Sequence, residues 1–163
     1  MKQLFAPWRL PYLMGEKEIG CVLCEKAKEK KDRANLVLYR GEHAFVMLNL
    51  YPYNNGHLMV CPYLHVSALS QLSEPALNNL IALVQKSEIA LQKSSKPTGM
   101  NVGLNLGKSA GAGIADHLHF HLIPRWDGDT NFTTVVSQVR VIPERLEDTY
   151  KRLKPYFKVL RTA

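Results

Sequence analysis

The sequence predicts an α+β fold: a mostly antiparallel sheet of about five strands, one long helix and a second helix near the C-terminus. Three observations support this prediction. Short strand-like segments follow one another closely, a long amphipathic segment interrupts them, and helical periodicity returns near the end of the chain. With 163 residues, 46% of them hydrophobic, the chain is long enough to bury a core as one domain.

The first three predicted strands lie close together. Residues 35–40 and 44–50 are apolar runs separated by a turn at Gly41 and Glu42, which predicts a hairpin. The loop YPYNNG follows, and a third strand over residues 57–62 ends at Pro62.

The clearest predicted helix covers residues 73–93. Ser73 can cap its N-terminus, and Pro75 falls in its first turn. The helix should end before Lys96 and Pro97. Its apolar residues recur at helical spacing and are expected to pack against the core: Leu77, Leu80, Ile81, Val84 and Leu91. After it come a fourth strand, 102–106, and a fifth, 117–123.

A second amphipathic segment starts at Pro143 near the C-terminus. Leu146, Tyr150 and Leu153 fall on one of its faces, which indicates a further helix packed against the core.

The fifth predicted strand, HLHFHLI, holds three of the six histidines. Strand alternation places His117, His119 and His121 on one face, and the apolar residues between them on the core side, under the 73–93 helix. One tetrahedral metal ion cannot easily bind all three, because His117 and His121 are about 13 Å apart at Cα. Metal–nitrogen bonds are only ~2 Å long, so at most a neighbouring pair could share an ion.

A row of imidazoles is well suited to phosphate chemistry. A neutral imidazole is a nucleophile at pH 7, and a neighbouring imidazolium can donate a hydrogen bond or a proton. The preceding loop, NLGKSAGAGIADH, has glycines that let backbone N–H groups approach an anion, and Lys108 adds charge. The alternative is a flexible connector. The loop is not a Walker A motif, being one residue short of that spacing.

The charge and composition limit the classes of partner that the chain is expected to bind. The net charge of +7 and a pI near 9.4 favour anions such as nucleotides, although many of the lysines fall in solvated segments. No specific nucleic-acid partner is expected, since no basic and aromatic stacking surface is evident. The N-terminus does not resemble a signal peptide, no segment is apolar enough for a membrane helix, and the three cysteines do not suggest a disulfide framework. A cytoplasmic location is therefore the expectation.

Beyond these observations, HLHFHLI fits the pattern HφHφHφφ, where φ is apolar. It resembles the signature of the histidine triad (HIT) family of nucleotidyl hydrolases and transferases. LNLYPYNNGHLMVCPYLHV (48–66) and NVGLNLGKSAGAGIADHLHFHLIPRWDGDTNF (101–132) are similar to the branch of bacterial diadenosine tetraphosphate phosphorylases and hydrolases. The resemblance covers roughly residues 5–135. It implies a single HIT domain over 1–163, with an N-terminal segment 1–33, a C-terminal extension 133–163, and a homodimer that joins two sheets.

The resemblance also implies a reaction. The family cleaves the α-phosphate bond of dinucleoside polyphosphates through a nucleotidyl-histidine intermediate, here on His119, which water or phosphate resolves. His121 and His117 would stabilise phosphoryl charge and orient or protonate groups around it. The residues implied to bind the nucleotide or its phosphates are Asn49, His57, Asn105, Gly111, Gly113, Ile114 and Trp126.

Several alternatives stay open from the sequence. The chain could act as a nucleoside phosphoramidase, or bind nucleotides without turnover. Asn49 could satisfy a strand end, His57 could be a core histidine, and Trp126 could pack on the rim of the sheet.

The CxxC at Cys21 and Cys24 is half of a zinc site, or equally two buried thiols. In some family members a CxxC, a later histidine and the first triad histidine hold a structural zinc. The matching set here is Cys21, Cys24, His65 and His117. No organic cofactor is expected, and Cys61, inside a strand, is interpreted as a buried apolar residue.

Overall fold

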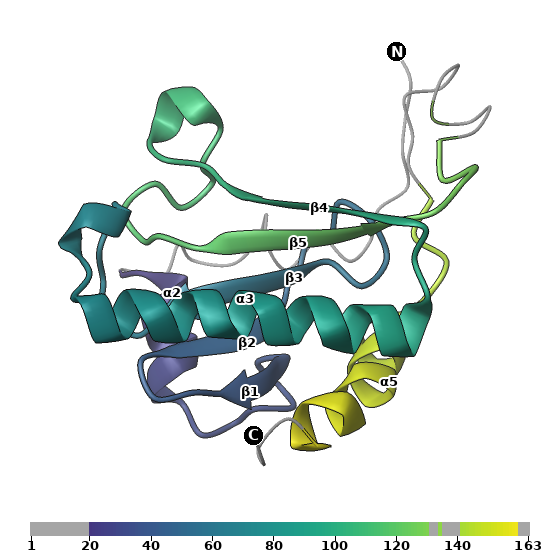
Figure 1. Cartoon of the computed structure of the whole chain (residues 1–163), viewed down its shortest axis with the longest axis horizontal. Coiled ribbons are helices and arrows are strands. Elements are labelled where there is room, and N and C mark those ends of the chain that lie inside the picture. The colour runs from purple at the N-terminus through teal and green to yellow at the C-terminus, as the bar shows by residue number, and fades with distance from the viewer. Residues whose placement is uncertain (1–19, 131–133, 135–140, 160–163) are drawn as a thin grey trace.

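The computed structural model describes residues 20–130, 134 and 141–159, and its centre is one five-stranded antiparallel sheet (Figure 1). The spatial order is β1-β2-β3-β5-β4. The strands are β1 (Val37–Arg40), β2 (Ala44–Leu48), β3 (Leu58–Pro62), β4 (Gly99–Leu104) and β5 (Phe120–Arg125). The predicted fold class and strand number are confirmed.

The long helix α3 (Glu74–Ser95) covers one face of this sheet and packs against β2, β3 and β5. Ser73 occupies the N-cap position, as predicted, but its side chain makes no capping hydrogen bond. Lys96 adopts a left-handed φ of 46°, which ends the helix before Pro97. The predicted apolar stripe was wrong at Ile81, which is 46% exposed, because the buried face is centred instead on Leu80, Leu83 and Leu91.

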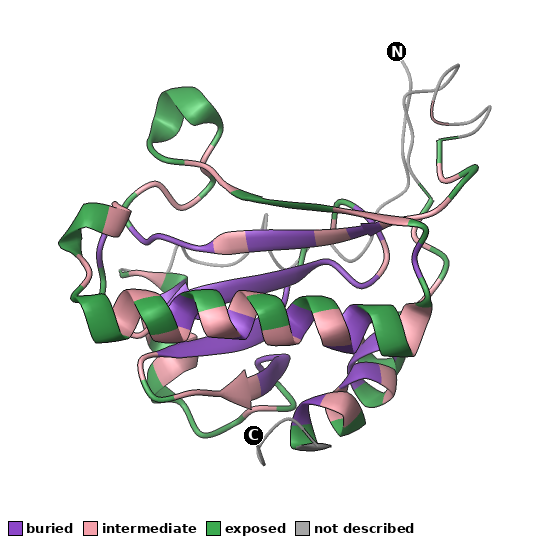
Figure 2. Cartoon of the chain, in the orientation of Figure 1, coloured by how far each residue is buried: buried purple, intermediate pink, exposed green. Residues whose placement is uncertain are grey.

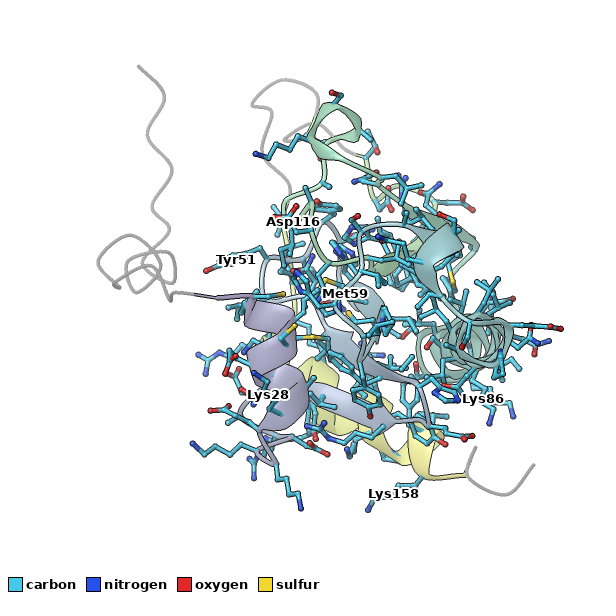
Figure 3. All side chains as sticks on the ribbon, turned by 90° about the vertical axis from the view of Figure 1, so that its left-hand side faces the viewer. Lys28, Tyr51, Met59, Lys86, Asp116 and Lys158 are labelled. Atoms are coloured by element: carbon cyan, nitrogen blue, oxygen red, sulfur yellow. The ribbon has the colours of Figure 1, made fainter. Side chains whose placement is uncertain are left out.

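The sheet separates two apolar clusters, and strands β2 and β3 between them are buried along their whole length (Figure 2). Side chains alternate along each strand, so Val46 and Val60 pack toward α3 while Phe45 and Cys61 point to the other face. There they meet Leu23 of the short helix α2 (Val22–Lys28). Figure 3, in which α3 is seen end-on, shows α2 and α3 on opposite sides of the sheet with Met59 between them.

The predicted C-terminal helix is present as α5 (Leu146–Val159). It packs against α3 and β1, with Tyr150 and Leu153 buried as predicted. The Tyr150 hydroxyl donates a hydrogen bond of 3.2 Å to the Val37 carbonyl. This part of the C-terminal extension is therefore built onto the sheet.

Each of the five strands differs from its predicted range at one or both ends, and the differences are largest in the first, fourth and fifth. The first strand begins at Val37 because Leu36 has a φ of 58° and residues 31–37 form hydrogen-bonded turns. The fourth strand covers 99–104 and not 102–106. The fifth begins at Phe120 and not His117, because the Leu118 N–H donates to the Val66 carbonyl, outside the sheet. Two single turns of 3-10 helix, η2 (Leu69–Gln71) and η3 (Lys108–Ala110), complete the connections.

Candidate active site and metal centre

Three histidines meet on the sheet face opposite α3. His121 on β5 is paired with Met59 of β3 and Gly103 of β4, and His57 directly precedes β3. The ring centroids of His119 and His121 are 4.7 Å apart, and those of His57 and His121 are 5.0 Å apart. All three are buried, and His119 and His121 keep 6% and 9% of their surface exposed while His57 keeps none.

The orientation of His119 is fixed by the chain just before it. Its Nδ1 lies 2.8 Å from the backbone carbonyl of His117. A carbonyl only accepts hydrogen bonds, so Nδ1 carries the proton. In the neutral ring the lone pair is therefore on Nε2, the nitrogen a nucleophile needs.

His57 and His121 form a chain of hydrogen bonds whose direction can be deduced. The backbone N–H of Tyr53 donates to His57 Nδ1 at 3.1 Å, so the His57 proton is on Nε2. That nitrogen is 2.9 Å from His121 Nδ1 and donates to it. The proton of neutral His121 is consequently on Nε2, turned away from His57.

Burial keeps both rings uncharged. It lowers the pKa of His57 to about 3, assisted by the neighbouring His121 and His119. It lowers the pKa of His121 to about 4, with His119 as the second cause. Near pH 7 this pair therefore offers an N–H donor and a neutral environment, not a fixed positive charge.

A second cluster contains the four residues that the resemblance implied as zinc ligands: Cys21, Cys24, His65 and His117. Their ligand atoms all lie within 4.8 Å of one another. His117 Nδ1 is 3.2 Å from Cys21 Sγ and 3.4 Å from Cys24 Sγ, and His65 Nδ1 is 3.3 Å from Cys24 Sγ. Sulfur and nitrogen ligands of one tetrahedral zinc stand about 3.5 Å apart. The spacing fits one such ion.

The surroundings of the cluster also fit a metal. His117 Nε2 is 2.9 Å from the Pro62 carbonyl and donates to it, which leaves the lone pair on Nδ1, toward the cysteines. Burial, with Cys21 as the next cause, raises the pKa of the Cys24 thiol. Two adjacent thiolates therefore require a cation, and the donor set Cys₂His₂ is one that zinc prefers. These residues could hold a metal ion.

The structure separates His117 from the other two triad histidines. Both of its ring nitrogens are engaged, one at Pro62 and one at the cysteines. The resemblance implied that His117 orients or protonates groups at the reacting phosphate. In this structure neither of its ring nitrogens is available for that role. Its backbone carbonyl, which positions His119, is its contribution to that side of the site.

The other predicted nucleotide-binding residues fall into two groups. Asn49 is at the site: its Nδ2 lies 3.3 Å from His57 Nδ1, and its Oδ1 accepts from the Tyr51 N–H. Asn105 directly follows β4, beyond the Gly103 that pairs with His121. The glycine loop joins Asn105 to His117. In it Gly111 has a φ of 84° and Gly113 is exposed. The Ile114 side chain packs against the apolar cluster that contains Leu23 of α2.

Trp126 lies apart from the histidines. It follows the far end of β5, roughly 17 Å along the strand from His121. Its indole N–H donates to the Ser95 carbonyl at the end of α3, at 3.3 Å. Within this chain the structure does not bring Trp126 to the catalytic histidines.

Sequence reasoning missed the groups that fix the tautomers. They are the N–H of Tyr53 and the carbonyls of His117 and Pro62, all backbone atoms with no residue-type signature. The one available signal was the YPYNNG loop, whose turn residues bring Tyr53 back to His57.

Fold and site together define a class: antiparallel α+β domains with a row of alternating histidines on one face of the sheet. The sequence model of the HIT domain matches residues 30–128, more than half of the chain, and the chain belongs to this family. It is 49% identical over 122 residues to a protein named AP-4-A phosphorylase from Mycobacterium tuberculosis, covering 75% of this chain. The chain spans only 63% of that relative's length. An uncharacterized HIT-like protein of Methanocaldococcus jannaschii is 37% identical over 118 residues, 72% of this chain and 88% of its own.

Solved structures agree with this assignment. A Zn-bound histidine triad family protein from Mycobacterium smegmatis superposes with a TM-score of 0.66 and 25% identity, covering 86% of this chain and 95% of that one. A hypothetical histidine triad nucleotide-binding protein from Sulfolobus tokodaii gives the same TM-score with 26% identity over 86% and 94% of the two chains.

Proposed function

We propose that this chain is an enzyme that cleaves the α-phosphate bond of dinucleoside polyphosphates such as diadenosine tetraphosphate. The observation that carries the proposal is the orientation of His119: its Nδ1–H bonds the His117 carbonyl, which leaves the lone pair on Nε2, and its ring centroid lies 4.7 Å from that of His121. The likeness to AP-4-A phosphorylase supports the substrate class. The net charge of +7 favours a polyanionic substrate.

In the first step His119 Nε2 attacks the α-phosphorus of the substrate. A nitrogen–phosphorus bond forms, and the bond from that phosphorus to the bridging oxygen breaks, so that ATP leaves from diadenosine tetraphosphate. His121 Nε2–H hydrogen-bonds the charged oxygens and gives its proton to the departing one. His57 and Asn49 hold His121 and the ribose side of the site, while Asn105 and backbone amides near Gly111 and Gly113 contact phosphate.

In the second step an acceptor attacks the adenylyl group on His119. The attacking oxygen bonds to phosphorus, the nitrogen–phosphorus bond breaks, and the imidazole is regenerated. Phosphate as the acceptor yields ADP, and water yields AMP. We propose phosphate, in line with the name of the relative.

A structural zinc on Cys21, Cys24, His65 and His117 is part of the proposal. The zinc-bound relative and the spacing of the four ligand atoms support it. When bound, the metal supplies cross-linking between α2, the segment after β3 and the histidine segment, and no step of the reaction passes through it.

We further propose that the enzyme acts as a homodimer in the cytoplasm. The outer strand β4 exposes 48% of Val102, and Leu106 just beyond it is 47% exposed, so this edge offers apolar surface to a second copy. Thiolate ligands favour a compartment where thiols stay reduced. Within the described residues, no helix combines the length and apolarity needed to span a bilayer. Light scattering should give about twice 18.4 kDa.

One incubation tests the function. Purified protein is mixed with diadenosine tetraphosphate, with and without inorganic phosphate, and the nucleotides are separated by ion exchange. ADP and ATP only in the presence of phosphate support phosphorolysis, whereas AMP and ATP indicate hydrolysis. No product at high enzyme concentration, with turnover of an adenosine phosphoramidate instead, would overturn the proposal.

A further inference from the structure

The loop between β2 and β3 is tied to the far end of β5 by one buried asparagine. Asn54 is only 5% exposed. Its side-chain NH₂ donates two hydrogen bonds, one of 3.0 Å to the Pro124 carbonyl and one of 2.8 Å to Asp129 Oδ2. Its Oδ1 accepts from the Asn55 N–H at 3.1 Å, so both polar atoms of the side chain are hydrogen-bonded.

The partner of Asn54 is itself held rigidly. Arg125 grips the Asp129 carboxylate with two bonds, from Nε at 2.6 Å and from a terminal nitrogen at 2.8 Å. Such a two-point pair fixes a carboxylate in orientation as well as position. Asp129 lies just beyond the matched HIT segment 30–128, in the GDTNF run that the proposed mechanism does not use.

The turn so anchored is the one that sets the histidine tautomers. Tyr53, next to Asn54, donates its N–H to His57 Nδ1, and the His57 N–H donates to the Asn54 carbonyl at 3.2 Å. Gly56 completes the turn with a φ of 75°, and a Cβ there would meet the Pro124 ring at 3.3 Å. The loop therefore sits tightly on Pro124, in a conformation suited to glycine.

We propose that Asn54, anchored on Asp129 and the Pro124 carbonyl, is a positioning residue for the reaction. It touches no substrate. It holds Tyr53 N–H against His57 Nδ1, and this contact places the His57 proton on Nε2 and thereby the His121 proton on its own Nε2, the nitrogen that does not meet His57. The inference rests on the proposed function for its kinetic consequence, but its structural content is independent of the substrate.

The test compares Asn54→Ala with the matched variant Asn79→Ala in the full chain. Asn79 also ties a turn, accepting the His43 N–H at 3.0 Å, but on the opposite side of the sheet from the histidines. Small misplacement of catalytic groups costs about 100-fold in rate. We expect kcat to fall about 100-fold in Asn54→Ala with KM within about threefold, and both constants to stay within about threefold in Asn79→Ala.

Long-range 1H–15N correlation spectra of the imidazole rings provide the readout that a general loss of stability would not change. The native spectrum should show His57 and His121 protonated on Nε2, and Asn54→Ala should mix the tautomers of both, while Asn79→Ala keeps the native pattern. If Asn54→Ala does not fold, Asp129→Asn, which removes the charged anchor, should show the same mixing and about a tenfold lower kcat.

Native tautomers in the Asn54 or Asp129 variant, or a kcat loss equal to that of Asn79→Ala, would overturn the positioning role. A native chain inactive on diadenosine tetraphosphate would defeat the proposed function alone, because the tautomer comparison would still decide the positioning role.

Discussion

His117 and His119 are two residues apart, yet the fold gives their rings opposite tasks. His117 donates from Nε2 to a carbonyl and turns Nδ1 to the cysteines, whereas His119 donates from Nδ1 to a carbonyl and keeps Nε2 for the substrate side. In the proposed function the same side chain serves as a metal ligand or as a nucleophile, according to which ring nitrogen bonds the backbone carbonyl. The ring nitrogen that a histidine of the row keeps available therefore depends on which nitrogen bonds a carbonyl, and not on its place in the motif.

The contrast has an energetic side as well. The four candidate metal ligands form one end of the site, the metal end. A substitution there is expected to lower the stability of the protein more than its rate of reaction. The other end, the catalytic end, contains His119 with His57 and His121, and burial keeps the last two uncharged. A substitution there is expected to lower the rate of reaction more than the stability.

The largest effect is expected at the catalytic end, from His119→Asn. Removing the nucleophile leaves no nitrogen to form the intermediate, and kcat on diadenosine tetraphosphate should fall by roughly 10⁴-fold or more. Asparagine can still donate a side-chain hydrogen bond to the His117 carbonyl, so metal content and thermal unfolding should stay near those of the native protein. Activity within tenfold of native would show that this histidine is not the nucleophile.

Cys24→Ser should produce the opposite pattern at the metal end. Loss of one thiolate should abolish stoichiometric zinc, measured by atomic emission, and lower the free energy of unfolding by about 3 kcal/mol or more. The kcat of the folded fraction should fall far less than in His119→Asn.

Cys61→Ala is the matched control, since Cys61 is fully buried in β3 and outside the metal set. It should cost packing energy but keep the zinc. Equal zinc loss in both cysteine variants would contradict the assignment of the ligands.

The pH dependence of stability tests whether the catalytic rings are neutral in the folded protein. Folding lowers the pKa of His57 to about 3 and that of His121 to about 4, against about 6.5 in the unfolded chain. Between these values the unfolded chain binds more protons, so the free energy of unfolding must fall as pH falls from about 6.5 toward 4. Above pH 6.5 this contribution is constant.

Urea unfolding at pH 7, 5.5 and 4.5 measures the loss, expected on the order of 5 kcal/mol over this range for the two rings together. Running the series in Cys24→Ser removes the separate effect of acid on a metal site. The carboxylate of Glu144 adds little over this range: hydrogen bonding to Arg152 lowers its pKa to about 2, against 4.5 in the unfolded chain, so its contribution is lost mainly below pH 4.5. A flat profile in Cys24→Ser would mean that the buried rings are not held neutral.

The smallest effect is expected from Asn55→Ala. Asn55 lies next to Asn54 in the loop between β2 and β3 and makes the contact of this loop with Glu144. Asn55 Nδ2 donates to Glu144 Oε2 at 3.0 Å, just before α5. Glu144 keeps its bonds to Arg152 and Thr149 in the variant. We expect kcat within about threefold and about 1 kcal/mol less stability.

The surface pair of Lys151 with Asp148 offers the control, because both side chains are more than half exposed. Lys151→Ala should change stability by less than about 0.5 kcal/mol. If Asn55→Ala changed kcat more than Asn54→Ala, the dominant anchor of the loop would be α5 and not β5.

The sequence was sufficient for the fold because its periodicities were strong. Alternation in HLHFHLI and the stripe of α3 predicted that the helix covers one face of the sheet, and only the rim of the stripe, at Ile81, was assigned to the wrong side. Strand ends were less predictable, because a φ such as that of Leu36 and a bond such as Leu118 N–H to Val66 come from neighbouring segments and not from residue preference.

The site divides in the same way. Residue types identified the histidine row and the four metal-site residues, because thiol and imidazole chemistry belongs to the side chain itself. The tautomers could not be predicted, since they are set by backbone groups of Tyr53, Pro62 and His117 that any residue provides. The position of Trp126 at the end of α3 likewise follows from strand length and tertiary packing.

The central claim is that His119 reacts through Nε2 while His117 belongs to the metal. It is tested most directly by trapping the intermediate: the zinc-loaded enzyme is mixed with diadenosine tetraphosphate without phosphate, quenched within milliseconds in alkali, digested and mapped by mass spectrometry. Phosphorus NMR of the trapped peptide then identifies the modified ring nitrogen. The account predicts one adenylyl group, on Nε2 of His119. An adenylyl group on His117 or His121, or on Nδ1 of His119, would contradict it.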